Sequence, residues 1–191
     1  MAEIIAFDNE KTGSLPPGWR AGVTGRGAPI WSAQADATAP GKPNVLKQSG
    51  SGTFPWCVRT DASFADGYVE VRFKPISGSE DQAGGVVWRF KDGDNYYVAR
   101  ANALEDNVSL YYTENGSRKT LKYIDAPVAG NVWHQLRVEF YGAAIKVMLN
   151  GKTCIEMTDN HIVGPGAVGV WTKADSVTLF DDFSYAAGPG R

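Results

Sequence analysis

Short runs in which apolar and polar residues alternate extend along almost the whole chain, and tight-turn dipeptides separate them. The run GGVVWRFKDGDNYYVARAN, residues 84–102, alternates with period two on both sides of a DGD turn, as the two strands of a hairpin do. Asn115-Gly116 and Asn150-Gly151 favour the positive φ that such turns need. No long stretch keeps the i, i+3, i+4, i+7 apolar spacing of a helix. The chain is therefore predicted to be all-β, a sandwich of two antiparallel sheets.

The period-two pattern predicts strands over residues 3–7, 29–33, 44–48, 54–60, 67–74, 84–90, 95–102, 107–113, 118–124, 133–141, 144–149, 152–158, 167–172 and 176–185. Segment 11–52 is the least regular part and is rich in Pro, Gly, Ser and Ala, so we expect it to contain long loops that cross one edge of the sandwich. A chain of 191 residues is long enough to bury a sizeable core. We assign residues 1–186 to one domain and residues 187–191 to a C-terminal tail.

The overall charge gives no reason to expect a nucleic acid as partner, because the net charge is −2 and the isoelectric point is near 5.7. No apolar run is long enough for membrane insertion. The two cysteines, Cys57 and Cys154, are too few for a disulfide framework, and each lies in a strand-like run. We expect buried free thiols, although the sequence leaves one disulfide open.

The stretch VWHQLRVEFYGAAIKVMLNGK, residues 132–152, resembles the W-H-x-L-x-V…G…I-x-V-x-L-N-G signature of concanavalin A-like, laminin-G-like jelly rolls. Residues 84–100 and 166–185 are similar to two further segments of that family, so the resemblance covers residues 67–185. Among its members the keto-disaccharide hydrolase-like domains are the most similar, although their usual N-S-G-I segment is replaced by residues 82–86. The resemblance implies a jelly roll that is commonly exported, and we expect a periplasmic or secreted protein although the N-terminus has no signal-peptide pattern.

Polar residues of several predicted strands fall on the face opposite the core. Their period-two positions predict one polar strip on the concave sheet, formed by Arg59, Glu70, Arg72, Arg89, Arg100 and Tyr111. Arginine offers a planar fork that suits vicinal hydroxyls and carboxylates, and arginines without matching acids favour a ligand over a stabilising role. We therefore predict a carbohydrate-binding module with an oligo- or polysaccharide in this groove. An ordinary solvated face remains the alternative.

Two other functions remain open. The first is a sugar-active enzyme, a glycoside hydrolase or lyase resembling the keto-disaccharide hydrolase-like domains, in which Glu70 would act as acid or base instead of orienting Arg72. The chain lacks the E-x-D-x-E pattern with which laminarinase-like jelly rolls place carboxylates on one strand face. The second is a laminin-G-like adhesion domain, which would expose an apolar patch.

Acidic residues follow the first predicted strand and lie in the last one, so the two ends of the chain are expected to meet. Asp8, Glu10 and Asp181 could supply three or four of the six to eight oxygens that calcium prefers. Sandwich modules that resemble this chain often hold a structural calcium at such a place. We predict a Ca²⁺ ion there, with plain surface carboxylates as the alternative.

Overall fold

The computed structural model describes residues 2–188, and this part of the chain consists of strands, turns and loops without a helix. The strands are β1 (Glu3–Ile5), β2 (Trp19–Ala28), β3 (Trp31–Ala35), β4 (Asn44–Gln48), β5 (Ser51–Arg59), β6 (Gly67–Ser77), β7 (Ala83–Asp92), β8 (Asn95–Asn102), β9 (Asn107–Glu114), β10 (Ser117–Asp125), β11 (His134–Tyr141), β12 (Ala144–Leu149), β13 (Lys152–Thr158), β14 (Ala167–Trp171) and β15 (Val177–Ala187). No helix in this part of the protein is long and apolar enough to cross a membrane.

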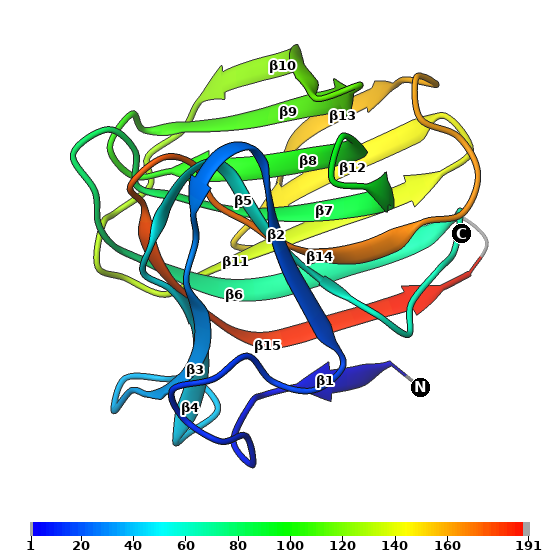
Figure 1. The fold of residues 1–191 in the computed structure, drawn as a ribbon. Coiled ribbons are helices and arrows are strands. Elements are labelled where there is room, and N and C mark those ends of the chain that lie inside the picture. The colour runs from blue at the N-terminus through cyan, green and yellow to red at the C-terminus, as the bar shows by residue number, and fades with distance from the viewer. Residues whose placement is uncertain (1, 189–191) are drawn as a thin grey trace.

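The strands form two sheets that pack face to face (Figure 1). Sheet A has eight strands in the order β13-β12-β11-β6-β15-β4-β3, with β1 added on β15. Sheet B has seven strands in the order β10-β9-β8-β7-β14-β5-β2, and the named pairs of both sheets are antiparallel. The prediction of a jelly-roll sandwich of two antiparallel sheets is confirmed.

The core lies between the sheets and uses the residues that period two assigns to it. Val69, Val71 and Phe73 of β6 are fully buried, as the alternation predicts. His134 is a packing residue: its ring stacks on Phe73, its Nε2 lies 2.7 Å from the Ala129 carbonyl oxygen, and its Nδ1 lies 3.0 Å from the amide nitrogen of Asn150. Both ring nitrogens are therefore occupied by structural partners.

Strand β2 occupies part of the segment in which long loops were predicted, and this prediction is wrong there. Its sequence, WRAGVTGRGA, does not alternate, because glycines interrupt it. Gly25 and Gly27 have φ of 87° and 131°, and the register with β5 shifts between Thr24 and Gly27. A bulged edge strand of this kind carries no period-two signal. At the other end, β15 continues to Ala187, one residue into the predicted tail, of which residues 189–191 lie outside the described part.

Sheet B is so strongly curved that side chains of strands far apart in the sheet meet across its concave outer face. Four strands separate β10 from β5, which in a flat sheet would put them about 24 Å apart. The guanidinium carbon of Arg118 on β10 nevertheless lies 4.6 Å from the ring centroid of Phe54 on β5. Large side chains fill this concave face, including Trp56, Tyr96 and Trp171, which form a second apolar cluster. The middle of the concave face is therefore packed with aromatic side chains.

Both cysteines are free thiols, as expected. Cys57 is fully buried, whereas Cys154 is only partly buried, so the expectation of burial holds in full for Cys57 alone. Burial raises the pKa of the Cys57 thiol far above its ordinary value.

Candidate functional site

The predicted polar strip does not exist as one surface, because its members belong to different sheets. Glu70 and Arg72 lie on β6 in sheet A, whereas Arg59, Arg89 and Arg100 lie on β5, β7 and β8 in sheet B. Period two assigns a residue to one face of its own sheet, and it does not say which sheet a strand joins. Glu70 and Arg72 therefore cannot share a face with Arg100 and Tyr111, which lie on the outer face of sheet B.

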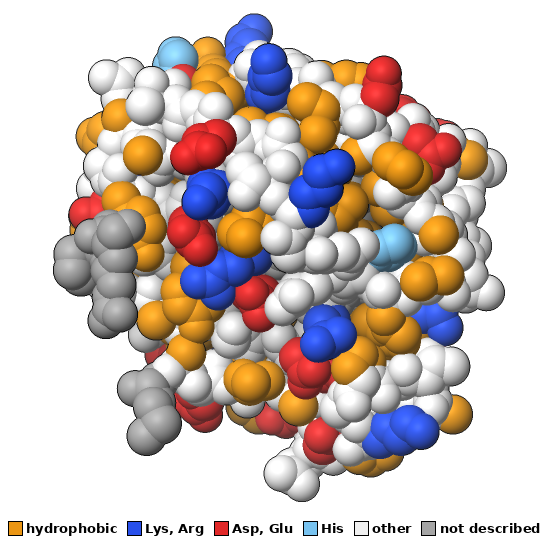
Figure 2. Space-filling view, turned by 180° about the vertical axis from the view of Figure 1, so that it is seen from behind, with side chains coloured by type: hydrophobic (Ala, Val, Ile, Leu, Met, Phe, Trp, Pro, Cys, Tyr) orange, Lys and Arg blue, Asp and Glu red, His pale blue; other side chains and the backbone are white. Residues whose placement is uncertain are grey.

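The predicted pairing of Glu70 with Arg72 is also wrong. Glu70 Oε2 accepts a hydrogen bond from Arg137 Nη1 at 3.2 Å, because Arg137 lies directly opposite Glu70 on β11. Arg72 Nε lies 3.5 Å from the Asp182 carboxylate on β15. Directly opposed residues of neighbouring strands are closer than residues two apart on one strand, so cross-strand pairs form first. Figure 2, which shows the molecule from behind, has acidic and basic side chains next to one another over this side.

Arg89 is a buried structural residue, with 2% of its surface exposed. The register between β7 and β8 shifts after Trp88, and Arg89 has a φ of 45°. This bulge turns its side chain towards the loops at the end of the sandwich. There it donates to the carbonyl oxygens of Ala65 at 2.8 Å, Ile162 at 3.0 Å and Gly142 at 2.7 Å. The prediction that Arg89 shares a face with Arg100 is wrong for this reason.

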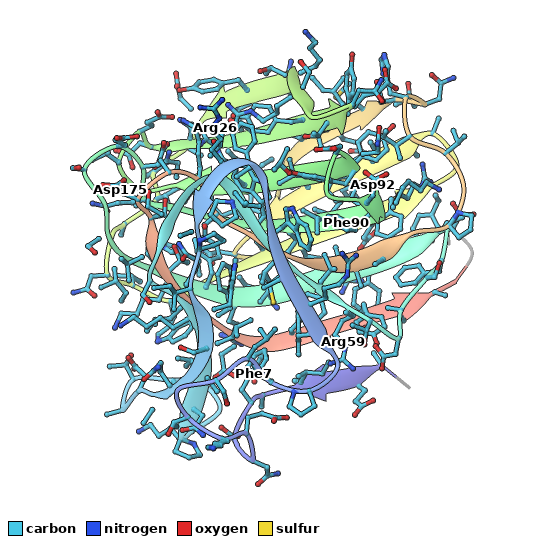
Figure 3. All side chains as sticks on the ribbon, viewed as in Figure 1. Phe7, Arg26, Arg59, Phe90, Asp92 and Asp175 are labelled. Atoms are coloured by element: carbon cyan, nitrogen blue, oxygen red, sulfur yellow. The ribbon has the colours of Figure 1, made fainter. Side chains whose placement is uncertain are left out.

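Arg59 is likewise held within the protein. It forms two hydrogen bonds with the Asp61 carboxylate, at 3.0 Å and 2.7 Å, and its guanidinium lies 5.2 Å from the ring centroid of Trp19. Figure 3 shows Arg59 well apart from Arg26 and Asp175. Arg59 is therefore not part of a common surface with Arg100.

Arg100 and Tyr111 do lie together, at one end of the concave face. The guanidinium of Arg100 is 5.6 Å from the ring centroid of Tyr111. Arg100 is buried, with 3% of its surface exposed, and it contacts two carboxylates, Asp81 at 3.3 Å and Glu105 at 3.1 Å. The prediction that this arginine has no matching acid is wrong.

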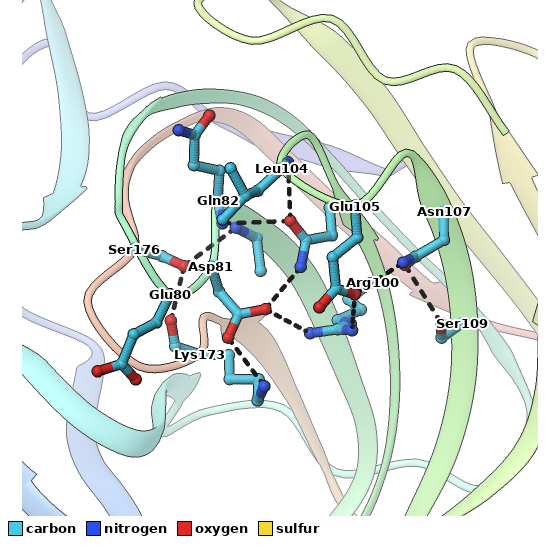
Figure 4. Close-up of polar contacts among 12 residues, drawn as sticks. Glu80, Asp81, Gln82, Arg100, Leu104, Glu105, Asn107, Ser109, Lys173 and Ser176 are labelled. Atoms are coloured by element: carbon cyan, nitrogen blue, oxygen red, sulfur yellow. Dashed lines mark hydrogen bonds and ion pairs between the residues drawn. The ribbon is translucent and has the colours of Figure 1, made fainter. Parts of the chain in front are cut away.

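These contacts belong to a larger polar group, which we call the Asp81 cluster and which Figure 4 shows in close-up. It consists of Asp81, Arg100, Asn102, Glu105, Asn107 and Lys173.

Two carboxylates organise the Asp81 cluster. Asp81 accepts from Arg100 at 3.3 Å, from Asn102 Nδ2 at 2.6 Å and from Lys173 Nζ at 2.8 Å. Glu105 Oε2 accepts from Arg100 at 3.1 Å and from Asn107 Nδ2 at 2.8 Å. Since each carboxylate is shared between two or more donors, the side chains are held in one arrangement before any ligand arrives.

The loop that carries Asp81 is itself fixed by Asp175. The Asp175 carboxylate accepts from the backbone nitrogens of Ser79 at 2.7 Å, Glu80 at 3.0 Å and Asp81 at 3.2 Å. Burial acts to raise the pKa of Asp175, but these hydrogen bonds outweigh it and hold the pKa well below its usual range. Asp81 is thus positioned by an acceptor that stays ionised.

Arg118 lies beside the cluster without a partner of its own. Its guanidinium is 4.1 Å from the ring centroid of Tyr111 and 4.6 Å from that of Phe54. Its Nη1 and the Nε of Arg100 are buried polar atoms that have no hydrogen-bond partner. Burial lowers the pKa of Arg118, and the charge of Arg100 lowers it further.

A surface hollow of about 410 Å³ opens next to the cluster. Lys173 and Glu80 line one side of it, and Arg26 and Thr53 line the other. Lys173 also donates to Asp81, so this side chain links the lining of the hollow to the buried cluster. A ligand that enters here meets the cations of Arg26 and Lys173 and the carboxylate of Glu80 within a small volume.

Sequence reasoning finds Arg100 and Tyr111 but misses Asp81, Glu105 and Lys173. All three lie in turns or loops between strands, where alternation gives no information. The DG and NG turns are visible in the sequence, but nothing in the segment SGSED marks Asp81 as the partner of two distant cations. A single sequence holds no signal for such a contact.

The acidic residues at the chain ends gather as predicted, with one exception. Asp181 is fully buried and accepts from the Gly41 backbone nitrogen at 2.8 Å. Burial, together with the charges of Asp182 and Asp8, raises the pKa of Asp181 to about 7. Glu10 meets this region through its backbone carbonyl, which accepts from Asn44 at 3.2 Å, rather than through its side chain.

Side chains alone do not complete a metal site at the chain ends. Within residues 2–188, no group of three or more His, Cys, Asp or Glu side chains is placed to hold an ion. A cation would need main-chain oxygens besides the carboxylates. The buried carboxylate of Asp181, which lies near the carboxylates of Asp8 and Asp182, has the negative charge that a cation needs. The number of side-chain ligands is too small for a complete coordination shell.

The chain is thus a jelly-roll sandwich that carries the preorganised Asp81 cluster at one end of its concave sheet. The family model of the 3-keto-alpha-glucoside-1,2-lyase-like domain matches residues 7–183, so the chain belongs to this family. The levanase of Bacillus subtilis (strain 168) is 26% identical over 127 residues, which are 65% of this chain and 18% of the levanase. The chain thus spans only a small part of the length of that curated relative.

Solved structures share the fold. The carbohydrate binding module CBM66 from Bacillus subtilis has a TM-score of 0.72 at 20% identity, over 88% of this chain and 96% of that one. The β-glucanase of Bacillus licheniformis has a TM-score of 0.57 at 13% identity, over 93% and 95% of the two chains. The exoplasmic/lumenal domain of VIP36, solved in a Ca²⁺- and mannose-bound form, has a TM-score of 0.61 at 13% identity, over 100% and 91%. At these identities the likeness establishes the fold.

Proposed function

We propose that this protein is a carbohydrate-binding module and that its saccharide binds at the Asp81 cluster, at the polar end of the concave face. The observation that carries the proposal is the prearranged set of charged side chains there: the Arg100 guanidinium is fixed by two carboxylates, and the partly exposed side chains of Glu105 and Lys173 extend from the cluster to the surface. The names of two proteins with this fold, a carbohydrate binding module and the Ca²⁺- and mannose-bound exoplasmic/lumenal domain of VIP36, support it.

The chemistry of the cluster suits a sugar. Neighbouring hydroxyls of a pyranose or furanose offer donors and acceptors close together, and they match a planar guanidinium together with amide and carboxylate groups. Tyr111 and Tyr123 bring aromatic surface to the same end, since the Tyr123 hydroxyl lies 3.0 Å from Asn107 Nδ2. Rigid polar forks beside aromatic rings are a common way to orient a ligand that has both polar edges and apolar faces.

A lyase or hydrolase that acts at the same cluster is the second candidate, and membership of the lyase-like family favours it. Against it, both carboxylates of the cluster are occupied by cations and amides: Asp81 accepts three hydrogen bonds and Glu105 accepts two. A general acid or base needs a carboxyl that is free to exchange a proton with the substrate. Glu70, the sequence-based choice, lies on sheet A and is paired with Arg137.

The test combines a glycan array with an assay for released sugar or released keto-sugar, both on the purified protein. We expect binding without turnover. Lys173→Gln should weaken binding by about tenfold, because one charge-assisted hydrogen bond is worth roughly 1.5–3 kcal/mol. Arg72→Gln on sheet A is the matched control and should bind as the wild type does. Release of a product would contradict the binding module and support the enzyme. If Lys173→Gln binds as tightly as the wild type, the saccharide site does not lie at the Asp81 cluster.

Two further proposals concern the surroundings of the domain. We propose that a Ca²⁺ ion binds at the chain ends, with Asp181 and Asp8 as carboxylate ligands and main-chain oxygens in the other positions. The fully buried Asp181 carboxylate supports this, since an ionised group there gains from a cation. We also propose that the protein works outside the cytoplasm, as the name of the structurally similar exoplasmic/lumenal domain of VIP36 suggests.

A further inference from the structure

Arg118 is the feature of the concave end that the contacts within the protein do not explain. It lies on β10 opposite Thr113 of β9, at the rim of the concave face. None of the hydrogen bonds or ion pairs formed among residues 2–188 uses its side chain, and its Nη1 is buried without an acceptor. A buried guanidinium nitrogen without an acceptor costs free energy, so the position of Nη1 calls for an explanation.

The orientation of this guanidinium is nevertheless fixed. It lies between two aromatic rings, 4.1 Å from the centroid of Tyr111 and 4.6 Å from the centroid of Phe54. Contacts with two rings hold the planar group in place without using its N–H donors. Arg118 is still partly exposed, and Nη1 is the one nitrogen of its guanidinium among the buried atoms without a partner, so Nε and Nη2 form the fork that it presents to a ligand at the rim.

The local charges leave Arg118 uncompensated. Asp81 is shared by Arg100 and Lys173, and Glu105 is paired with Arg100. Three cations, Arg100, Lys173 and Arg118, thus face two carboxylates that are already engaged. The missing partner has to be an acceptor, and the one that neutralises the charge as well is an anion.

We infer that the saccharide bound at this end carries a carboxylate, as a uronic acid residue does, and that Arg118 receives this carboxylate through its planar fork. The inference rests on the proposed function, because it assigns a chemical class to the ligand of the same site. A carboxylate offers two coplanar oxygens at the spacing of two parallel guanidinium N–H groups, and this match distinguishes it from an isolated hydroxyl. Loss of one such charge-assisted fork lowers affinity by about tenfold to a hundredfold.

The experiment compares each acidic polysaccharide with its own carboxyl-reduced form. Polygalacturonate, alginate and hyaluronan, their carboxyl-reduced derivatives, and neutral levan and β-glucan are titrated against the full chain by isothermal calorimetry. We expect at least one acidic polymer to bind, and we expect reduction of its carboxyl groups to weaken binding by tenfold or more. Arg118→Gln should reduce the affinity for the acidic polymer to that of the reduced polymer, with no further loss when both changes are combined.

Lys119→Gln is the matched control, because it removes the same charge from the next residue of β10, which faces the other side of the strand. It should leave binding unchanged, and thermal melting checks that both variants are folded. Binding of a neutral polymer that is equal to or tighter than that of the acidic ones, or full affinity in Arg118→Gln, overturns the inference while the carbohydrate-binding module stands. Binding of none of these polymers contradicts the module itself as well as the carboxylate.

Discussion

The buried carboxylate of Asp181 should make the protein less stable as the pH rises towards neutrality. Burial raises its pKa from 3.8 to about 7 in the folded state. Below about pH 4 the Asp181 carboxyl is protonated in both the folded and the unfolded state, so the free energy of unfolding is not reduced by its ionisation. Between the two pKa values the unfolded chain releases the proton and the folded one keeps it, so stability is lost as the pH rises through 7. A difference of about 3 pH units corresponds to roughly 4 kcal/mol, and we expect a loss of about 2–4 kcal/mol.

Urea unfolding between pH 4.5 and 8.5 in excess EDTA measures this loss. Carboxyls with lowered pKa, such as Asp175 and Asp159, act below about pH 4 and stay outside this window. Asp181→Asn loses one of the two hydrogen bonds that the carboxylate accepts, from Gly41 and Asp182, but it cannot titrate. The free energy of unfolding of the wild type should therefore fall with rising pH relative to that of Asp181→Asn. Parallel profiles, or a wild type that gains stability relative to the variant, would refute the reasoning.

Three further predictions follow from the contacts. Adding Ca²⁺ at pH 8 should restore the stability that ionised Asp181 removes and raise the melting temperature by several degrees over EDTA, and identical melting curves in both buffers would exclude the ion. Arg89→Met should destabilise by roughly 3–5 kcal/mol, because it removes a buried guanidinium that donates to three carbonyl oxygens, of which that of Ile162 is buried. Arg72→Gln on the surface should change the stability by no more than about 1 kcal/mol. Chemical denaturation compares the two variants, and a small effect at Arg89 would contradict its structural role. The native protein should react with a thiol reagent at Cys154 and only after unfolding at Cys57, so two fast thiols in the native state would contradict the burial of Cys57.

The fold could be predicted from the sequence because its signals are local. The alternation of Val69, Val71 and Phe73 assigns the core side of β6 correctly, and the turn dipeptides place the hairpins. The bulge at Arg89 could not be predicted, since an extra residue in a strand leaves no mark in the alternation before it. That one bulge moves Arg89 away from the face on which Arg100 lies.

The site could be predicted only in part, because its contacts are not local. Asp81 and Lys173 are 92 positions apart in the chain, and Arg118 reaches Phe54 only because sheet B curls. Alternation states that Arg100 and Tyr111 face away from the core, which is correct, but curvature decides what they meet. Sheet membership, curvature and loop contacts are set by the packing of the whole domain, and they determine which charges pair.

The pairing of β1 with β15 has a mechanical consequence. Glu3 lies opposite Tyr185 and Ile5 lies opposite Phe183, so the first residue of β1 and the last residues of β15 lie at the same end of this strand pair (Figure 1). A force that pulls residues 3 and 187 apart loads the hydrogen bonds between these strands one after another, as in a zipper. Tension would therefore peel β1 from sheet A first and then disturb the neighbouring Asp8. The Asp81 cluster belongs to sheet B, so a molecule under tension between its two ends would still bind its ligand after β1 had detached from sheet A.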